Sequence, residues 1–171
     1  MLLYFQSMTE IDHARLMCIY QESNLDNISY FFPDCKDEAE GLRKVEERFI
    51  SFLNTDFWGK PENTYYIWED DGKWVSALRL TRLKDFYWVE GLETAPDARR
   101  RGYAVRLYKA IFDRLKELEG SVHVQCAVGH KNEASLKTHE SAGFQIKSRY
   151  AFNPLYNEQE DSCYLLACDC P

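Results

Sequence analysis

Hydrophobic side chains recur at helical spacing twice in the first third of the chain. The first run covers residues 10–22, with Thr9 placed to cap its start, and the second covers residues 37–53. In each run the apolar positions fall on one side, so each predicts an amphipathic helix that packs this side inward. Residues 23–34 lack this period, and we expect a loop there.

Alternating apolar and polar positions, rich in β-branched and aromatic residues, predict strands in most of the remaining chain. These strands cover residues 2–6, 65–68, 74–80, 86–94, 122–128, 145–152 and 162–167. Asp71 and Gly72 favour a tight hairpin turn between the second and third of them. Residues 3–7 also resemble the remnant of an expression-tag cleavage site, but Met1 and Leu2 do not match that site, and we favour a strand.

Two further helices are predicted at residues 104–118, ending at Gly120, and at residues 132–142, closed by Gly143. The element order is then β-α-α-β-β-β-α-β-α-β-β, which is typical of an α/β fold with a mixed sheet flanked by helices. A chain of 171 residues without repeats or linkers suits one domain over residues 1–171.

Composition narrows the class of protein. A hydrophobic fraction of 45% is too high for a disordered chain. The sequence has no apolar run approaching the roughly 20 residues of a membrane span and no secretion signal, so we expect no membrane partner. Six scattered cysteines then indicate reduced thiols and a cytoplasmic protein. Among them Cys163, Cys168 and Cys170 lack the paired spacing of a zinc site, and we expect no metal.

Charge is distributed unevenly along the chain. Residues 1–71 have a balance of −9 and residues 72–171 a balance of +2, which together give −7. Nucleic acid is a poor partner, since it requires a basic face. The acidic half is either an ordinary solvated surface or an attractive field for a cationic substrate.

The sequence around the predicted junction of strand and helix at residues 94–104 is unusual. Three arginines, Arg99, Arg100 and Arg101, precede Gly102 at a helix start, where the positive end of the dipole disfavours cations. An anion held by the main-chain amides of about residues 100–105 explains this arrangement, and Gly102 lets the backbone approach it closely. A solvated basic turn is the alternative. The motifs of Walker-type and dinucleotide-binding loops are missing.

These residues resemble the GNAT superfamily of N-acetyltransferases. The pyrophosphate motif of that family, Arg/Gln-x-x-Gly-x-Gly/Ala, fits residues 99–104, and the family's preceding strand matches at Glu90, Leu92 and Pro96. A second family motif fits residues 132–144, with His139 where the family usually has tyrosine. The resemblance therefore implies a GNAT-like, mostly antiparallel sheet.

The resemblance also implies acetyl-CoA as the cofactor. In the family a bulged strand splays away from its neighbour, and pantetheine pairs with its main chain. Carried onto this chain, the main-chain contacts fall to Leu92 and Thr94, and Asn132 and Ser135 approach the pantetheine arm. The residues expected at the CoA phosphates are Arg99, Arg100, Arg101, Gly102, Tyr103, Ala104 and Val105.

Acetyl transfer requires a base for the amine and some help for the leaving thiolate. His139 occupies the family's acid position and can donate a proton near neutral pH, or else it is a packed helix residue. Glu90 is the candidate base, or else a structural carboxylate, and strand alternation places Glu93 on the opposite face. Aromatic residues at positions 30, 65 and 87 are either pocket walls or core.

The expected activity is direct transfer of an acetyl group to a primary amine on a small molecule or peptide. The alternative is a non-catalytic CoA-binding or sensory domain, which the missing tyrosine favours. A homodimer, frequent in similar proteins, is compatible with either.

Overall fold

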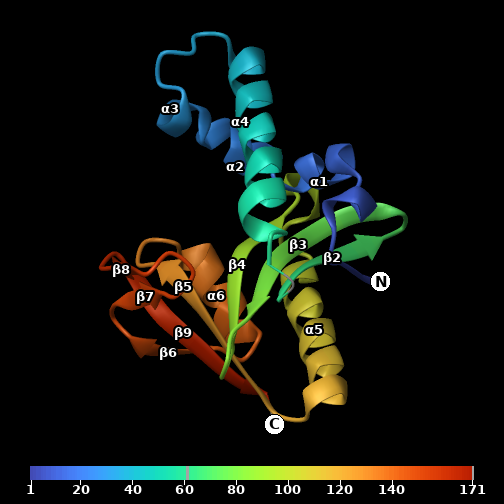
Figure 1. Cartoon of the computed structure of the whole chain (residues 1–171), viewed down its shortest axis with the longest axis vertical. Coiled ribbons are helices and arrows are strands. Elements are labelled where there is room, and N and C mark those ends of the chain that lie inside the picture. The colour runs from blue at the N-terminus through green and yellow to red at the C-terminus, as the bar shows by residue number, and fades with distance from the viewer. Residues whose placement is uncertain (61, 171) are drawn as a thin grey trace.

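The computed structural model describes residues 1–60 and 62–170 and is built on one seven-stranded sheet (Figure 1). In spatial order the strands are β1 (Leu2–Phe5), β2 (Asn63–Asp70), β3 (Lys73–Arg82), β4 (Tyr87–Thr94), β5 (Val122–Gly129), β9 (Cys163–Cys170) and β6 (Gln145–Ser148). The β4–β5 pair is parallel and the other pairs of this sheet are antiparallel. The prediction of a mixed, mostly antiparallel sheet is therefore confirmed.

Helices cover both faces of the sheet. The sheet therefore separates two main clusters of core side chains. On one face α5 (Tyr103–Glu119) and α6 (Glu133–Ser141) pack on side chains such as Leu78 and Val124. On the other face α1 (His13–Ile19) and α4 (Glu38–Phe52) belong to a cluster around Tyr65 and Ala77. Alternate residues of a strand point to opposite faces, so β3 supplies both cores.

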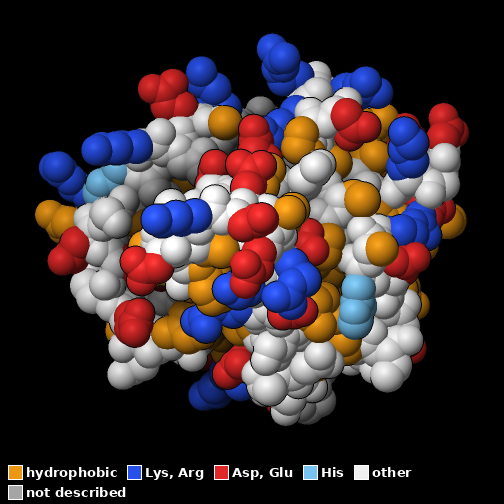
Figure 2. All heavy atoms as spheres, turned by 90° about the horizontal axis from the view of Figure 1, so that it is seen from above, with side chains coloured by type: hydrophobic (Ala, Val, Ile, Leu, Met, Phe, Trp, Pro, Cys, Tyr) orange, Lys and Arg blue, Asp and Glu red, His pale blue; other side chains and the backbone are white. Residues whose placement is uncertain are grey.

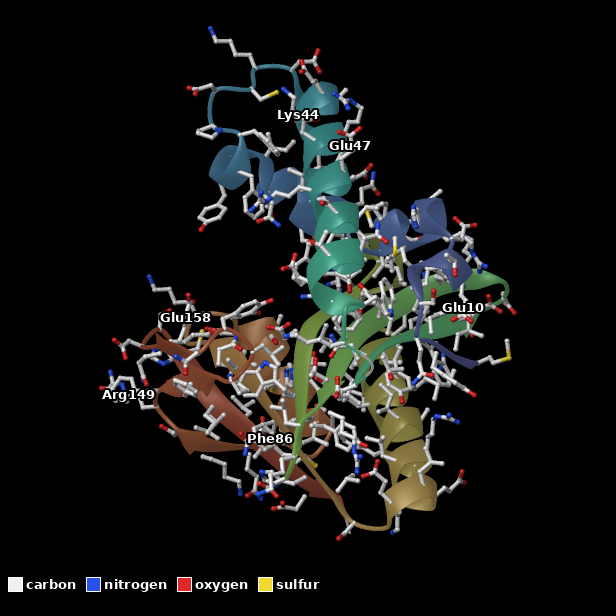
Figure 3. All side chains as sticks on the ribbon, in the orientation of Figure 1. Glu10, Lys44, Glu47, Phe86, Arg149 and Glu158 are labelled. Carbon is white, nitrogen blue, oxygen red and sulfur yellow. The ribbon has the colours of Figure 1, made fainter. Side chains whose placement is uncertain are left out.

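The predicted loop at residues 23–34 is wrong, because most of this segment is helical. It forms α2 (Gln21–Asp26) and α3 (Ile28–Phe31), which with α4 make an arm rising from the sheet (Figure 1). Ile28 fits against Gly41 of α4, where a Cβ atom would come within 2.6 Å of it. Contacts with α4, rather than local periodicity, thus fix these short helices. Figure 3 shows Lys44 and Glu47 on the part of α4 that stands clear of the sheet.

Several short elements complete the fold. The 3₁₀ helices η1 (Met8–Glu10) and η3 (Pro96–Ala98) precede α1 and α5. Helix α4 runs on as a single π-helical segment, η2 (Leu53–Phe57), in which the Trp58 amide donates to the Leu53 carbonyl. Such π-helical turns are frequent at functional sites, so this one marks the C-terminal end of α4 as a candidate functional region.

Turn chemistry explains the element boundaries that were predicted well. Asp71 and Gly72 both have positive φ, of 46° and 74°, as a tight hairpin turn between β2 and β3 requires. The expected strand at residues 145–152 instead divides, because the Tyr150 amide donates to the Ser148 side chain and the chain leaves the sheet. Its second half, β7 (Ala151–Asn153), pairs with β8 (Glu158–Glu160) in a separate hairpin.

The surface mixes charges of both signs. Figure 2 shows acidic and basic side chains interspersed on the face seen from above the arm. No helix in the described ranges combines the length and apolar character needed to cross a membrane. Within the same ranges no cluster of histidine, cysteine and acidic side chains can hold a metal ion. The side chain of Cys170, in the C-terminal cysteine set, lies outside the described part.

Candidate active site

Strands β4 and β5 separate partway along their length. They pair only from Tyr87 to Val89 on β4, opposite Val124 to Cys126 on β5, and diverge beyond that point (Figure 1). The later residues of β4 remain paired with β3 on the other side, up to Thr94 opposite Ser76. The main chain of β4 therefore presents an open edge toward β5 inside the sheet, which is a place for an added strand.

A bulge marks the point where the strands part. Arg79 of β3 pairs with Glu90 but Ala77 pairs with Glu93, so β4 has one extra residue here. Gly91 lies in this bulge with φ of +59°, a conformation that L side chains rarely adopt. The Tyr20 hydroxyl donates to the Gly91 carbonyl at 2.7 Å, so the residue between α1 and α2 holds the bulge in place.

A groove of about 660 Å³ runs from this bulge to the start of α5. Its walls contain ten of the residues assigned to CoA from the sequence: Leu92, Thr94, Arg99, Arg100, Gly102, Tyr103, Ala104, Val105, Asn132 and Ser135. Arg101 is missing from the walls and is exposed. The structure thus brings nearly all of that set into one continuous site.

The start of α5 leaves its first main-chain amides without partners within the helix. Gly102 is its N-cap with φ of +77°, Arg100 has φ of +60°, and no side chain caps the helix. The first amide of the helix paired with its own main chain is that of Arg106, which donates to the Gly102 carbonyl. The amides of the first turn are thus left for a ligand, as in other helix N-termini that bind phosphate.

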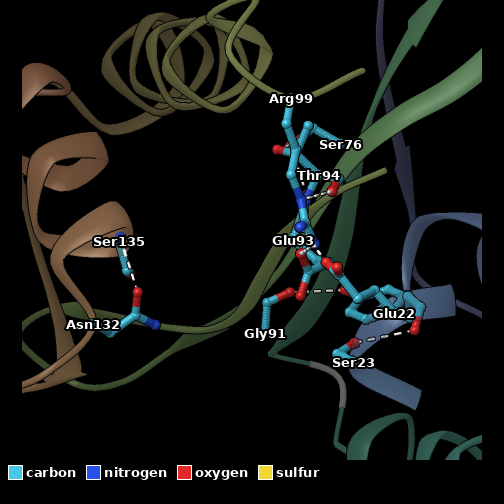
Figure 4. Close-up of polar contacts among 10 residues, drawn as sticks. Glu22, Ser23, Ser76, Gly91, Glu93, Thr94, Arg99, Asn132 and Ser135 are labelled. Carbon is cyan, nitrogen blue, oxygen red and sulfur yellow. Dashed lines mark hydrogen bonds and ion pairs between the residues drawn. The ribbon is translucent and has the colours of Figure 1, made fainter. Parts of the chain in front are cut away.

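The side chain of Arg99 makes several polar contacts at the groove wall. Its guanidinium pairs with Glu22 of α2 and, at 3.2 Å, with Glu93 of β4, and its Nε donates to the Thr94 carbonyl (Figure 4). This side chain joins the arm to the bulged strand across the groove wall. All three arginines are exposed, but Arg99 is the one held by carboxylates.

A second cavity, of about 730 Å³, lies between the arm, the end of α4 and the bulge. Its walls include Tyr20, Phe31, Arg48, Phe49, Phe52, Asp56 and Arg79. The two cavities share Ser23, Leu92 and Glu93, so they meet where β4 bulges. The tyrosines at positions 30, 65 and 87 are not among the lining residues, and Tyr65 is fully buried, donating to the Tyr20 hydroxyl.

Glu93, and not Glu90, occupies the junction of the two cavities. The bulge at Gly91 adds one residue to the alternation, so both glutamates share a face and the expectation that Glu93 points away is wrong. Burial raises the pKa of the Glu93 carboxyl, while the Thr94 amide and Arg99 oppose this rise. Glu90 is outside both cavity walls, 4.0 Å from Arg79 and in contact with Asn153.

The split sheet, the bulge and the uncapped helix agree with what the sequence motifs imply. A comparison with family models establishes to which family the chain belongs. The model of the Acetyltransferase (GNAT) family matches residues 19–144. This chain belongs to the GNAT acetyltransferase family. None of the curated proteins matches it.

Solved structures of GNAT acetyltransferases share the fold at low sequence identity. The ribosomal-protein-S18-alanine N-acetyltransferase from Escherichia coli is 17% identical with a TM-score of 0.58, covering 99% of this chain and 94% of its own. An N-acetyltransferase from Thermoplasma acidophilum, in complex with coenzyme A, is 10% identical with a TM-score of 0.63 and 98% coverage of both chains. An aminoglycoside 6'-acetyltransferase is 12% identical with a TM-score of 0.63, covering 100% of this chain and 97% of its own.

The second GNAT motif lies on α6 beside the groove. Asn132 is the N-cap of this helix, and its side-chain oxygen accepts the Ser135 amide at 3.0 Å (Figure 4). Both residues line the groove together with Thr94.

His139, at the position of the family's tyrosine, is turned into the core. It is only 3% exposed and is outside the groove walls. Its Nδ1 donates to the Ser135 carbonyl at 2.7 Å, so its Nε2 accepts the Tyr108 hydroxyl at 2.8 Å. Burial lowers the pKa of this imidazole, which holds it neutral. These contacts fit the alternative of a packed histidine better than the predicted proton donor.

Replacing His139 by phenylalanine is expected to change how stability depends on pH. The lowered pKa means that the unfolded chain takes up a proton that the folded chain does not, once the pH falls below about 6.5. This histidine therefore costs the wild type up to about 1.4 kcal/mol of unfolding free energy between pH 7.5 and 5.5. The variant lacks that loss, but leaves the Tyr108 hydroxyl unpaired at every pH.

Urea unfolding at pH 7.5 and 5.5 measures this difference. Replacing the exposed His13 by glutamine is the matched control and keeps the wild-type dependence. An unchanged dependence in the His139 variant contradicts the assignment of a neutral, buried imidazole.

Proposed function

We propose that this chain is an acetyl-CoA-dependent N-acetyltransferase that passes the acetyl group directly to a primary amine. The observation that carries the proposal is the meeting of two cavities at the β4 bulge, one ending at an uncapped helix and one lined by ionisable and aromatic side chains. Such an arrangement holds a donor and an acceptor in separate sites with their reactive ends together, which is how proximity lowers a bimolecular barrier.

The groove fits coenzyme A by its own chemistry. The unpaired amides of residues 103–105 suit a pyrophosphate, with Arg100 and Lys137 adding positive charge. The open edge of β4 at Leu92 and Thr94 suits a chain with amide groups, which is the character of pantetheine. When bound there, acetyl-CoA supplies a thioester with an electrophilic carbonyl carbon.

Residues at the bulge then have definite tasks. A main-chain amide near Leu92 donates to the thioester carbonyl oxygen as negative charge develops on it. Glu93 accepts the proton of the attacking amine, directly or through water, because it faces both cavities. We assign this role to Glu93 in place of Glu90, whose carboxylate lies beside Arg79 and Asn153.

A non-catalytic CoA-binding domain is the second candidate. The observation that favours it is the burial of His139, since that position offers no proton donor to a leaving thiolate. A thiol pKa near 8.5 makes such a donor a modest requirement, because the thiolate is a good leaving group at neutral pH. The base at the cavity junction, by contrast, is present, and this favours the enzyme.

The test combines binding and turnover. Calorimetric titration with coenzyme A is expected to show one site, and free-thiol release from acetyl-CoA is expected with members of a panel of primary amines. Ligand at 100 times its dissociation constant also adds about 2.7 kcal/mol to the free energy of unfolding. Binding without thiol release for any amine supports the non-catalytic domain, and absence of binding removes both candidates.

A further inference from the structure

Arg79 is a cation placed in the wall of the second cavity, among apolar neighbours. It follows Leu78 and precedes Leu80 on β3, and its side chain is only 13% exposed. The rings of Phe49 and Phe52 lie 5.7 and 5.1 Å from the guanidinium carbon. A guanidinium removed from water needs acceptors for its five N–H groups, or its burial is unfavourable.

The described residues provide few of these acceptors: the Tyr65 hydroxyl interacts with the guanidinium, but no carboxylate lies within hydrogen-bonding distance of it. The nearest carboxylate oxygen, on Glu90, lies 4.0 Å away, beyond hydrogen-bonding distance. The Arg79 Nε is fully buried without a partner. The other Glu90 oxygen lies 3.5 Å from the amide nitrogen of Asn153. Arg79 thus has at least one donor without a partner, and its side chain lines a cavity.

The formal charges of the cavity wall balance, with two acidic and two basic side chains. Its two acidic side chains already have donors: Thr55 donates to Asp56 at 2.5 Å, and Arg99 pairs with Glu93 at 3.2 Å. Its two basic side chains, Arg48 and Arg79, have no carboxylate within hydrogen-bonding distance among the residues described. The two arginines therefore remain available to pair with an anionic group of a ligand.

The position of Arg79 beside the bulge limits the distance between an anionic group bound to Arg79 and the amine that attacks at the bulge. A Cβ atom on Gly91 would lie 2.9 Å from the guanidinium carbon, so the two are in contact. An anion paired with Arg79 therefore lies beside the bulge, where the amine attacks if the proposed function is correct. The amine and the anion of the acceptor must be separated by only a few bonds.

We propose that Arg79 binds a carboxylate of the acceptor, and that the acceptor is an amine with a carboxylate close to its amino group, as in an amino acid. A carboxylate matches the planar guanidinium in shape and in charge, and can pair with two of its N–H groups at once. The aromatic side chains of the arm and α4 supply an apolar surface for the rest of the molecule. This inference rests on the proposed function for the placement of the amine.

The experiment compares a panel of amino acids with their own carboxamides, which differ only in the charge of one group. Thiol release gives kcat/KM for each, and calorimetry without acetyl-CoA gives the affinity. We expect at least one amino acid to exceed its amide about tenfold in both, a preference worth about 1.4 kcal/mol. Arg79→Gln is expected to remove the preference, mainly by weakening the acid and leaving the amide within about threefold.

The matched control is Arg43→Gln, which removes an exposed arginine of α4 outside the cavity and should keep the preference. Equal use of acids and amides by the wild type overturns the inference, and so does a preserved preference in Arg79→Gln. Because the wild-type comparison needs no variant, a poorly folding Arg79→Gln does not remove the test. Titration with coenzyme A judges the proposed function separately: binding of coenzyme A with equal use of acids and amides leaves that function intact.

Discussion

Replacing Gly102 by glutamate is expected to abolish binding of coenzyme A, lowering the affinity at least about 100-fold. Gly102 is the N-cap of α5 and lines the groove, where the unpaired amides of the first turn converge. A carboxylate there takes the place of the anion at the positive end of the helix and repels phosphate. Calorimetric titration with coenzyme A measures the loss directly.

The matched control is Gly120→Glu at the opposite end of the same helix. Gly120 has φ of +78° against +77° for Gly102, and neither position has an atom within 4 Å of an added Cβ. Both substitutions carry a backbone penalty at positive φ, which is larger at Gly120 because its ψ is −125° against 13° at Gly102, but only Gly102→Glu places charge in the groove. Normal affinity in Gly102→Glu, with the control also normal, would remove the phosphate site from the start of α5.

Replacing Glu93 by glutamine is expected to reduce kcat about 100-fold or more while leaving coenzyme A affinity within about threefold. Glutamine has nearly the same shape but does not accept the amine proton. The raised pKa of Glu93 adds a signature in pH. A base acts when deprotonated, so wild-type activity is present above this pKa and falls as the pH drops through it, at a higher pH than an ordinary glutamate gives.

Glu90→Gln serves as the comparison, because Glu90 is on the same strand and face but outside both cavities. It is expected to retain kcat within about fivefold and to keep the acidic limb of the pH profile. The opposite result, a large loss in Glu90→Gln with normal turnover in Glu93→Gln, restores Glu90 as the base.

Features governed by local chemistry were predictable from the sequence. The hairpin at Asp71 and Gly72, the end of α5 at Gly120 and the order of most elements along the chain follow from turn residues and periodicity. Gly102 was predictable too, since arginines before a glycine at a helix start are explained by an anion. The short helices α2 and α3 and the strand β8 were not, because their own sequences are too short to specify them without packing partners.

Three site residues depend on effects that a single strand or helix pattern does not contain. Glu93 reaches the cavities because the bulge at Gly91 adds a residue to β4. A prediction that assumes strictly alternating side chains along a strand does not include such a bulge. His139 is held in the core by Tyr108, which is 31 positions earlier in the chain. Arg79 is detectable in the sequence as a charged residue inside an apolar strand. Its role is not, because the cavity that it lines is formed only when the arm packs beside the sheet.

Because β4 separates from β5, the main chain and the side chains of β4 can serve different purposes. Since a carrier lying in that opening is recognised by peptide groups, which every residue type possesses, the side chains of β4 are released from the task. They are free to differ according to the molecule that receives the acetyl group. In such a fold, point substitutions on β4 can change which acceptor is used without changing how the acetyl donor is bound.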